Sequence, residues 1–460
     1  MANRYDAIEK YKLEIETTAP LHVGSSFGER SEVLVHPLTN LPFVQASSIA
    51  GVLRSTSEYV NGIEKTAGLF GSSLQDAADT DTGSRVYISD GEFQKETVRM
   101  EYRPRVSIDP VTGTVSSGEI SGSGQMSGHK FDMELIGQGA RLVFFLYLFH
   151  EKQDELKEFL EAVLSEMKAG QILIGGQKSN GSGAFKLISL KHHSFAMDNA
   201  ADRSDWAVEE EMDAEKVPAS APKYQGISDS LSNTGKELQK FAIKLQGKTE
   251  SGLLVKGVAA EGVGKDAADE ENMRNASGRF IVPGSSLKGA LRSRMAYIAE
   301  YLGKKEIVPV IFGIAGDKKT RGNNGILQFR DIVMAQHTPT LRQRRIHIDK
   351  FTGGVMNGAL FSEETISGEI QAEIIVENGN NAEAAAGLLI LALRDLAYGI
   401  MNLGSGFSVG RGFIQVEKLT IQSLQDGKSA EIQFTEQGNR ITRSDDLIKK
   451  CLQALQQWGA

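Results

Sequence analysis

The stretch "IVPGSSLKGALRSR" at residues 281–294 decides the fold, because an earlier part of the chain repeats it without a gap. Residues 43–56 read "FVQASSIAGVLRST", which keeps a valine, the Ser-Ser pair, a glycine and the Leu-Arg pair at the same spacing. The first copy has Gln-Ala where the second has Pro-Gly, and it has Ala50 where the second has Lys288. The repetition and these differences both require a physical explanation.

Four more pairs of segments repeat in the same order, at a separation of about 230–240 residues. They are "LFG" at 69–71 with "IFG" at 311–313, "RVSIDPVTG" at 105–113 with "RIHIDKFTG" at 345–353, "FDMELI" at 131–136 with "FSEETI" at 361–366, and the glycine triad Gly175, Gly181 and Gly183 with Gly404, Gly410 and Gly412. Chance similarity between glycine-rich turns does not explain a shared order. The repeats therefore indicate two homologous domains in tandem.

Each copy has the same sequence of local patterns. An alternating segment predicts a strand, and the Ser-Ser pair then begins an apolar pattern of helical period, so we expect the serine hydroxyls to cap that helix. A strand, a long hairpin, another strand, a second helix, a glycine-rich turn and a final strand follow. This order is the split βαβ pattern, so the sequence predicts an α+β fold made of two tandem ferredoxin-like domains.

The domain boundaries follow from composition. We expect a first unit at 1–195, an acidic linker at 196–236, a second unit at 237–424 and a C-terminal extension with an amphipathic helix at 425–460. Eight acids against two bases at 198–216 contribute −6 of the net charge of −8, so the rest of the chain is close to neutral. A partner that carries negative charge is therefore not excluded.

Composition also indicates the cellular compartment of the protein and whether it associates with a membrane. The single cysteine, Cys451, cannot form a disulfide within the chain or a cysteine-based metal site, which fits a cytoplasmic protein. The longest apolar run, "LVFFLYLF" at 142–149, is far too short to span a bilayer, so we expect no membrane association.

A glycine- and serine-rich turn at a helix start is an anion site, because it presents backbone N–H groups at the positive end of the helix dipole. Basic side chains beside these turns favour phosphate as the anion, although a simple helix cap and solvated charged faces are the plainer alternatives. The candidate RNA-binding residues are Ser47, Ser48, Arg54, Arg105, Gly284, Ser285, Ser286, Lys288, Arg292, Arg345, Gly410, Arg411 and Gly412.

In combination, "VPGSSLKGALR", the "RIHIDKFTGG…GALFSEE" hairpin and the "GRGF" turn resemble the RAMP superfamily. More narrowly, they resemble the backbone subunits of type III CRISPR effector complexes, and the fusion of two units resembles type III-D systems. The resemblance implies that the chain polymerises along a guide RNA with other effector subunits. It also implies that long hairpins, called thumbs, displace bases at intervals. The thumbs would be 104–136 and 344–366, the first longer by about ten residues and looser at its tip.

The resemblance further implies that single-stranded target RNA pairs with the guide and is cut beside each displaced base. In this family the cut needs an aspartate in the loop before the Ser-Ser helix and a divalent metal, for which we expect Mg²⁺. Alignment on Arg274 places Asp269 at this catalytic and metal-binding position, with Asp266 as the fallback. The first copy has Arg30 there, between Glu29 and Glu32, so one unit would cut while the other mainly holds RNA. Whether Glu29 or Glu32 replaces the missing aspartate stays open.

Two rival functions remain open at this stage. A purely architectural subunit would bind guide RNA and neighbouring proteins without cutting, and the acids around Asp269 would then be a solvated loop. A guide-processing nuclease of the same superfamily would favour histidine acid–base chemistry. The histidines to consider for that role, His22, His129 and His347, are scattered along the sequence.

Overall fold

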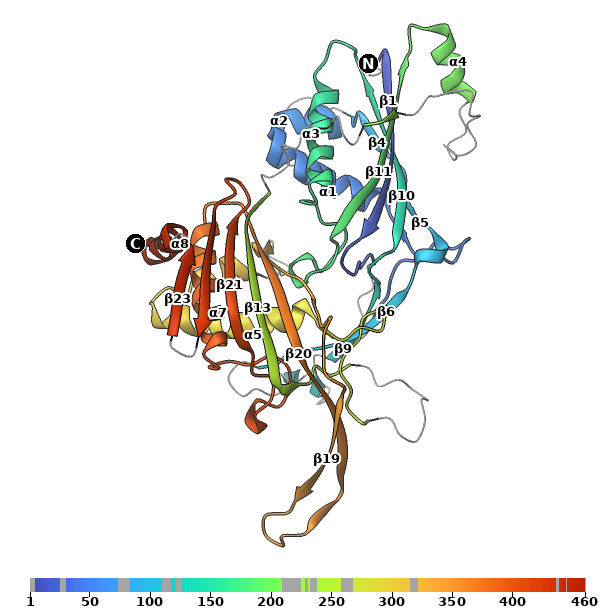
Figure 1. Cartoon of the computed structure of the whole chain (residues 1–460). Coiled ribbons are helices and arrows are strands. Elements are labelled where there is room, and N and C mark those ends of the chain that lie inside the picture. The colour runs from blue at the N-terminus through green and yellow to red at the C-terminus, as the bar shows by residue number, and fades with distance from the viewer. Residues whose placement is uncertain are drawn as a thin grey trace.

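The structure is a computed structural model of a chain with two α+β units (Figure 1). It describes residues 5–24, 30–72, 83–109, 117–120, 126–128, 130–208, 225–227, 231, 238–257, 268–314, 322–435, 438–443 and 445–459. Asp266 and His129 lie outside these residues, as does most of the predicted tip of the first thumb.

The first unit is built around an antiparallel sheet in which β1 lies between β10 and β11, and β10 also pairs with β4 and β5. Its elements in chain order are β1 (Ala7–Thr17), β2 (Arg30–Ser31), β3 (Phe43–Val44), α1 (Ala46–Asn61), α2 (Ile63–Phe70), β4 (Val86–Ile88), β5 (Gly91–Phe93), β6 (Met100–Val106), β7 (Ser117–Ile120), β8 (Met126–Gly128), β9 (Lys130–Ile136), β10 (Arg141–His150), α3 (Leu156–Lys168) and β11 (Phe185–Ala196).

The second unit repeats this arrangement, with β13 between β20 and β21 and with β17 beside β20. Its elements are β13 (Gln239–Leu253), β14 (Ile281–Val282), α5 (Gly284–Tyr301), α6 (Ile307–Phe312), β15 (Gly313–Ile314), β16 (Asn323–Asn324), β17 (Leu327–Phe329), β18 (Ile332–Val333), β19 (Leu341–Ile348), β20 (Val355–Glu377), α7 (Ala382–Ala397), β21 (Gln415–Ser423), β22 (Ser429–Thr435), β23 (Gly438–Arg443) and α8 (Asp445–Gln457). Both units have the ferredoxin-like strand order, which confirms the predicted fold class.

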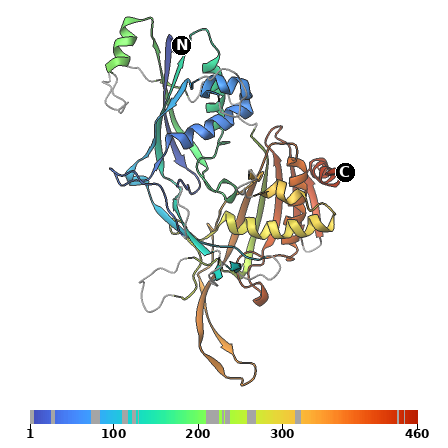
Figure 2. The same cartoon turned by 180° about the vertical axis from the view of Figure 1, so that it is seen from behind.

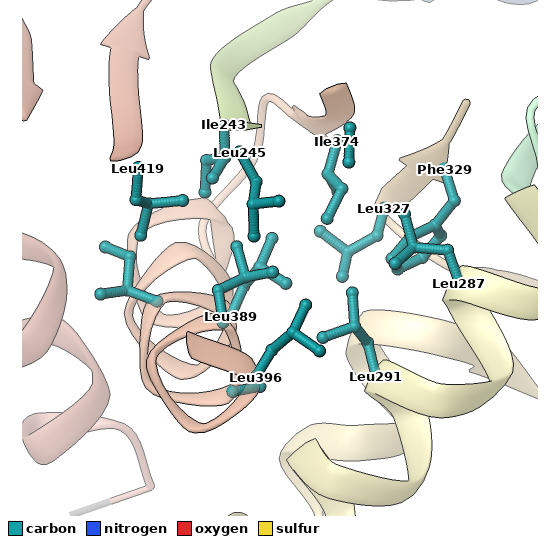
Figure 3. Packing of buried hydrophobic residues seen from close by; sticks show 14 of the residues in the cluster. Ile243, Leu245, Leu287, Leu291, Leu327, Phe329, Ile374, Leu389, Leu396 and Leu419 are labelled. Atoms are coloured by element: carbon teal, nitrogen blue, oxygen red, sulfur yellow. The ribbon is translucent and has the colours of Figure 1, made fainter. Parts of the chain in front are cut away.

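Each sheet buries one face against helices, as Figure 2 shows from behind. In the second unit, Leu287 and Leu291 of α5 and Leu389 and Leu396 of α7 meet side chains of the sheet (Figure 3). These leucines recur at helical spacing, while the strands contribute every second residue. The burial of this apolar surface is the main force that holds α5, and therefore its first turn, at a defined place on the sheet.

Backbone pairing supports the alignment of the two copies. Phe43 pairs with Glu92 in the first unit, as Ile281 pairs with Val333 in the second. In the hairpins, Arg103 pairs with Met133 and Gln343 pairs with Glu363, so these four positions are also equivalent. The alignment of residues 43–56 with 281–294 therefore extends to the strands and hairpins, with gaps between the matched segments.

The predicted helix caps are wrong in one respect. The Ser-Ser pairs lie inside the first turns of α1 and α5, whose N-cap residues are Gln45 and Pro283, and their hydroxyls make no capping bond. The first backbone N–H of each helix instead donates to an aspartate that follows a short strand of the same unit, Asp90 after β4 and Asp331 after β17. Ala46 N donates to Asp90 Oδ1 at 2.6 Å, and Gly284 N donates to Asp331 Oδ1 at 2.8 Å. An ionised carboxylate is a stronger acceptor at the positive helix end than a hydroxyl.

Each unit carries a long hairpin beside its sheet. The first hairpin pairs β6 with β9, and the second pairs β19 with the first part of β20, from Leu341 opposite Thr365 to Ile348 opposite Val355. The second hairpin projects away from both units (Figure 1).

The segments between and after the units contain more structure than expected. The predicted linker begins with a helix, α4 (Ala200–Val208), whose Trp206 packs edge-on against Tyr147, Phe149 and Phe195. A short strand, β12 (Gln225–Gly226), then pairs with β11. One large aromatic side chain anchors an otherwise polar helix, which acidic composition alone did not indicate.

The C-terminal extension contains the expected amphipathic helix, α8, which buries Leu447, Ile448, Cys451 and Leu455 in the second core. Strands β22 and β23, which the sequence analysis did not predict, extend the sheet before it. Among the described residues, no helix is both long and apolar enough to cross a membrane.

Candidate nucleic-acid interface

The two glycine-rich turns have the same backbone conformation. Gly175, Gly181 and Gly183 have positive φ angles of 80°, 85° and 90°, and their counterparts Gly404, Gly410 and Gly412 have 77°, 80° and 73°. Space is also limited at the end of each turn. A Cβ on Gly183 would lie 2.1 Å from the carbonyl oxygen of Ile174, and one on Gly412 would lie 1.9 Å from that of Leu403. Glycine is therefore required for both reasons.

The first turn lies on the start of α5, so the site spans both units. A Cβ on Gly181 would lie 2.1 Å from Phe329 O, and one on Gly284 would lie 2.6 Å from Asn180 O. Lys288 Nζ donates to Ser179 Oγ at 2.7 Å. We call this contact between the turn 175–183 and the start of α5 the junction.

A buried ion network holds the junction together. Arg103 Nη2 lies 2.6 Å from Asp331 Oδ2, and Arg103 Nε donates to Glu101 Oε1 at 2.5 Å. The second oxygen of Glu101 accepts from Ala276 N of the second unit at 3.0 Å. Asp331 therefore caps α5 and pairs with the first hairpin at once.

Three basic side chains, Arg105, Lys178 and Lys288, lie beside the junction, where burial disfavours their charged forms. Burial, together with the smaller effects of the charges of Arg292 and Arg105, lowers the pKa of Lys288 to about 8. Burial and the neighbouring Arg103 lower the pKa of Arg105 to about 10, and burial also lowers the pKa of Lys178. A bound anion would relieve this mutual repulsion. We call Arg105, Lys178 and Lys288 the junction cations.

Within the first unit, the helix start and the turn also line a shared cavity. It has a volume of about 400 Å³ and is bounded by Ser47 and Ser48 of α1, His22, Gly175 and Lys178, among others. Lys178 therefore connects this cavity to the junction. The sequence analysis missed Lys178 and Ser179, although both lie between Gly175 and Gly181 of the glycine triad, where a lysine among glycines was the available signal.

The second hairpin presents apolar and basic side chains to solvent. Ile346 and Leu360 are cross-strand partners, as are Ile348 and Val355, and all four are exposed. Phe351 at the tip is 85% exposed. Exposed apolar side chains beside arginines are typical of surfaces that contact nucleic-acid bases and backbone.

Arg345 and Arg411 lie at the base of this hairpin and share one carboxylate. Glu363 Oε2 lies 2.9 Å from Arg345 Nε and 2.8 Å from Arg411 Nη1, and Arg411 Nη2 donates to Gln343 at 2.6 Å. Arg411 is only 4% exposed. Through these two contacts, Arg411 holds the second turn against the hairpin.

Asp269 lies beside the base of the second hairpin with an exposed side chain. Its Oδ2 accepts from Ser362 N at 2.6 Å and from Ser362 Oγ at 2.9 Å. These two hydrogen bonds, with a smaller contribution from Arg342, hold the pKa of Asp269 below its usual value. Among the described residues, no group of three or more His, Cys, Asp or Glu side chains could hold a metal ion.

The same region supports the alignment of Asp269 with Arg30. Arg30 and Ser31 pair in parallel with Asp132 and Met133, and Glu270 pairs in parallel with Glu363. Because Met133 and Glu363 are equivalent, Ser31 corresponds to Glu270 and Arg30 to Asp269. An acid in one unit thus replaces a base in the other at the same backbone position.

The remaining candidates are placed as follows. Arg54 donates to Gly71 O at 2.9 Å and pairs with Glu58, so it supports the end of α2. Arg292 is exposed on α5 and lies over the ring of Phe312. His22 is buried with Nδ1 3.0 Å from Glu134 O, whereas His347 is exposed on the second hairpin, so the two lie in different units.

The fold and site define a class of protein: two fused ferredoxin-like units whose glycine-rich turn and helix start meet across the units. A family model described as "RAMP superfamily" matches residues 14–186 and 248–415, and the chain belongs to this superfamily. No curated protein matches the sequence.

Solved structures match as well. One is described as the type III-B Cmr-beta bound to cognate target RNA, with 18% sequence identity and a TM-score of 0.32. The match covers 40% of this chain and 60% of that chain, which is less than two thirds of the latter.

Proposed function

We propose that this protein is a backbone subunit of a type III CRISPR ribonucleoprotein, which binds guide RNA across the junction and cleaves target RNA in its second unit. Membership of the RAMP superfamily and the tandem architecture support the class. The observation that carries the binding proposal is the group of junction cations, whose lowered pKa values mark a site that favours an added anion. RNA phosphates supply such anions at regular spacing.

The second hairpin and Asp269 support the cleavage proposal. The exposed apolar side chains of the hairpin suit insertion between bases, and Asp269 lies at its base as an ionised, oriented carboxylate. A carboxylate there can orient the RNA so that its 2′-hydroxyl attacks the neighbouring phosphate as the bond from phosphorus to the 5′-oxygen breaks, which leaves a 2′,3′-cyclic phosphate and a 5′-hydroxyl. Mg²⁺ binds through one or two carboxylates together with phosphates and water, so Asp269 fits it as a partial ligand set. When bound, the ion would supply positive charge near the scissile phosphate.

Binding of labelled guide RNA to the full chain tests the first part. Affinity should fall steeply with salt, and scrambling the RNA sequence should change it little, because phosphates carry no sequence information. Lys178→Ala with Lys288→Ala should weaken binding strongly. Lys244→Ala is the matched control, since this lysine lies on β13 and pairs with Glu373. Equal affinities of the double variant and the control would refute the junction as the binding site.

A further inference from the structure

The junction is a contact between two different surfaces, although both units have the same fold. The first unit contributes its turn, and the second contributes its helix start. Each unit carries both surfaces, so among the described residues one of each makes no contact of this kind: the turn 404–412 and the start of α1, which we call the unused turn and the unused helix start. A heterologous contact of this kind can continue from one subunit to the next.

The unused turn is exposed where the used turn is covered. Gly410 has φ +80°, like Gly181, but a Cβ on Gly410 would meet nothing within 4 Å. Phe407 and Val409 of this turn are 53% and 51% exposed. The turn 404–412 thus has the same backbone conformation as the turn that packs in the junction. At Gly410, no described residue of the chain packs against it.

The unused helix start does not fit this turn sterically. Gly284 tolerates the close approach of Asn180 O only because it has no side chain, since a Cβ would lie 2.6 Å away. Its counterpart in the first unit is Ala46, which has that Cβ. Real Cβ atoms essentially never approach a carbonyl oxygen closer than 3.0 Å. A second copy of the chain would therefore clash in this geometry.

Contact between the unused helix start of one copy and the unused turn of another would also leave a carboxylate without a neighbouring cation. In the junction, Asp331 is neutralised by Arg103, which also binds Glu101. The counterparts of Asp331 and Arg103 are Asp90 and Gln343. Asp90 is exposed and has no ion pair in the part of the chain that the structure describes. A second copy would place this carboxylate against an amide that Arg411 already engages.

We propose that the turn 404–412 docks the glycine-initiated helix of a different subunit of this fold, and that Ala46 and Gln343 exclude a second copy of this chain. Specificity then arises from a steric clash and an unpaired carboxylate, not from an added attraction. The inference rests on the two-unit fold and its junction, and it does not require the proposed RNA cleavage.

Sedimentation velocity of the full chain without RNA provides the test. We expect the wild-type chain to remain monomeric. The substitutions Gln45→Pro and Ala46→Gly give the start of α1 the Pro-Gly sequence found at the start of α5. The substitutions Leu341→Glu and Gln343→Arg place a Glu–Arg pair at the base of the second hairpin, at the positions equivalent to Glu101 and Arg103. The fully converted chain should self-associate end to end at least about tenfold more tightly than wild type, because a charged hydrogen-bonded pair is restored.

Two further measurements keep the result decisive. In the first measurement, one chain carries only the helix-start substitutions and a second chain carries only the hairpin substitutions. After circular dichroism has verified that both are folded, a mixture of the two should form a heterodimer. Gly410→Val should abolish every association, because Gly181 shows that this position packs against a backbone carbonyl. Failure of the folded, converted chains to associate would overturn the proposal. Wild-type self-association that Gly410→Val abolishes would overturn it as well.

Discussion

Single residues separate the two units more than their folds do. Asp269 and Arg30 occupy equivalent positions beside their hairpins, as do Gly284 and Ala46 at the helix starts. Gly284 is required by a close contact with the first unit, and Lys288 reaches the same turn. The loss of Pro-Gly and lysine from the first copy therefore has a physical reason: among the described residues, the first helix start meets no such turn.

Asp269→Ala should abolish one target-RNA cut while guide and target binding stay near normal. A single exposed carboxylate adds little to the grip on an extended duplex, so rate and affinity should separate. Cleavage mapping of labelled target in the assembled complex is the measurement, and chelation of divalent ions should suppress the same cut. Arg30→Ala is the matched control in the first unit. An unchanged set of cuts in the Asp269 variant would favour the architectural alternative.

Lys288 should make RNA affinity depend on pH in the alkaline range. Its pKa is lowered to about 8 by burial and neighbouring cations, and bound phosphate would raise that pKa by favouring the charged form. The contribution is therefore complete below about pH 8 and is lost as the pH rises above this value. Titration of affinity in the wild type and in Lys288→Arg checks this, because arginine stays charged throughout. Identical pH profiles would contradict the role of Lys288.

At the scale of elements, the two glycine-rich turns can be compared with each other within one chain. Gly181 and Gly410 have nearly equal positive φ angles, so alanine at either position introduces similar backbone strain of about 1–2 kcal/mol. Only Gly181 also faces a carbonyl oxygen of the other unit. The two turns therefore differ in what they contact and not in how they fold.

Gly181→Ala should weaken the junction, whereas Gly410→Ala should cost only the backbone strain. Hydrogen exchange of the amides in the first turn of α5 is the measurement, since it reports local opening. We expect faster exchange there in Gly181→Ala and unchanged exchange in Gly410→Ala. Equal effects of the two substitutions would show that the close approach to Phe329 is unimportant.

At the scale of the whole molecule, the network of Arg103, Glu101 and Asp331 couples the two units. Arg103 is 3% exposed, and both of its carboxylate partners are largely buried. Loss of the shared cation leaves these two carboxylates with their backbone hydrogen bonds but without Arg103 as a counter-charge. Removal of one partner from a buried ion pair typically costs about 3–5 kcal/mol.

Arg103→Ala should therefore separate the thermal unfolding of the two units. Calorimetry of the wild type should show more strongly coupled transitions than that of the variant, whose first transition should move to lower temperature. Arg141→Ala is a suitable control, because this arginine pairs with Glu14 and Glu16 at the surface of the first sheet. A variant that unfolds like the control would show that the network does not couple the units.

The sequence by itself determined the features that depend on local chemistry. Strand alternation, helical periodicity and glycines at positive φ are properties of short segments, so the repeat, the ferredoxin-like topology and both glycine-rich turns were predictable from residues. The hairpins and the C-terminal helix followed for the same reason. The position of Asp269 followed from alignment, but its hydrogen bonds to Ser362 did not.

The tertiary structure alone decided which distant groups meet. Asp90 and Asp331 cap helices that begin 44 and 47 residues before them in sequence, in place of the adjacent serines. Arg411 is buried against Glu363, although its pattern suggested an exposed RNA contact. The first turn meets the second helix, whereas its homologue is left open. Such pairings depend on how packed units bring segments together, and no period or spacing in one sequence encodes that.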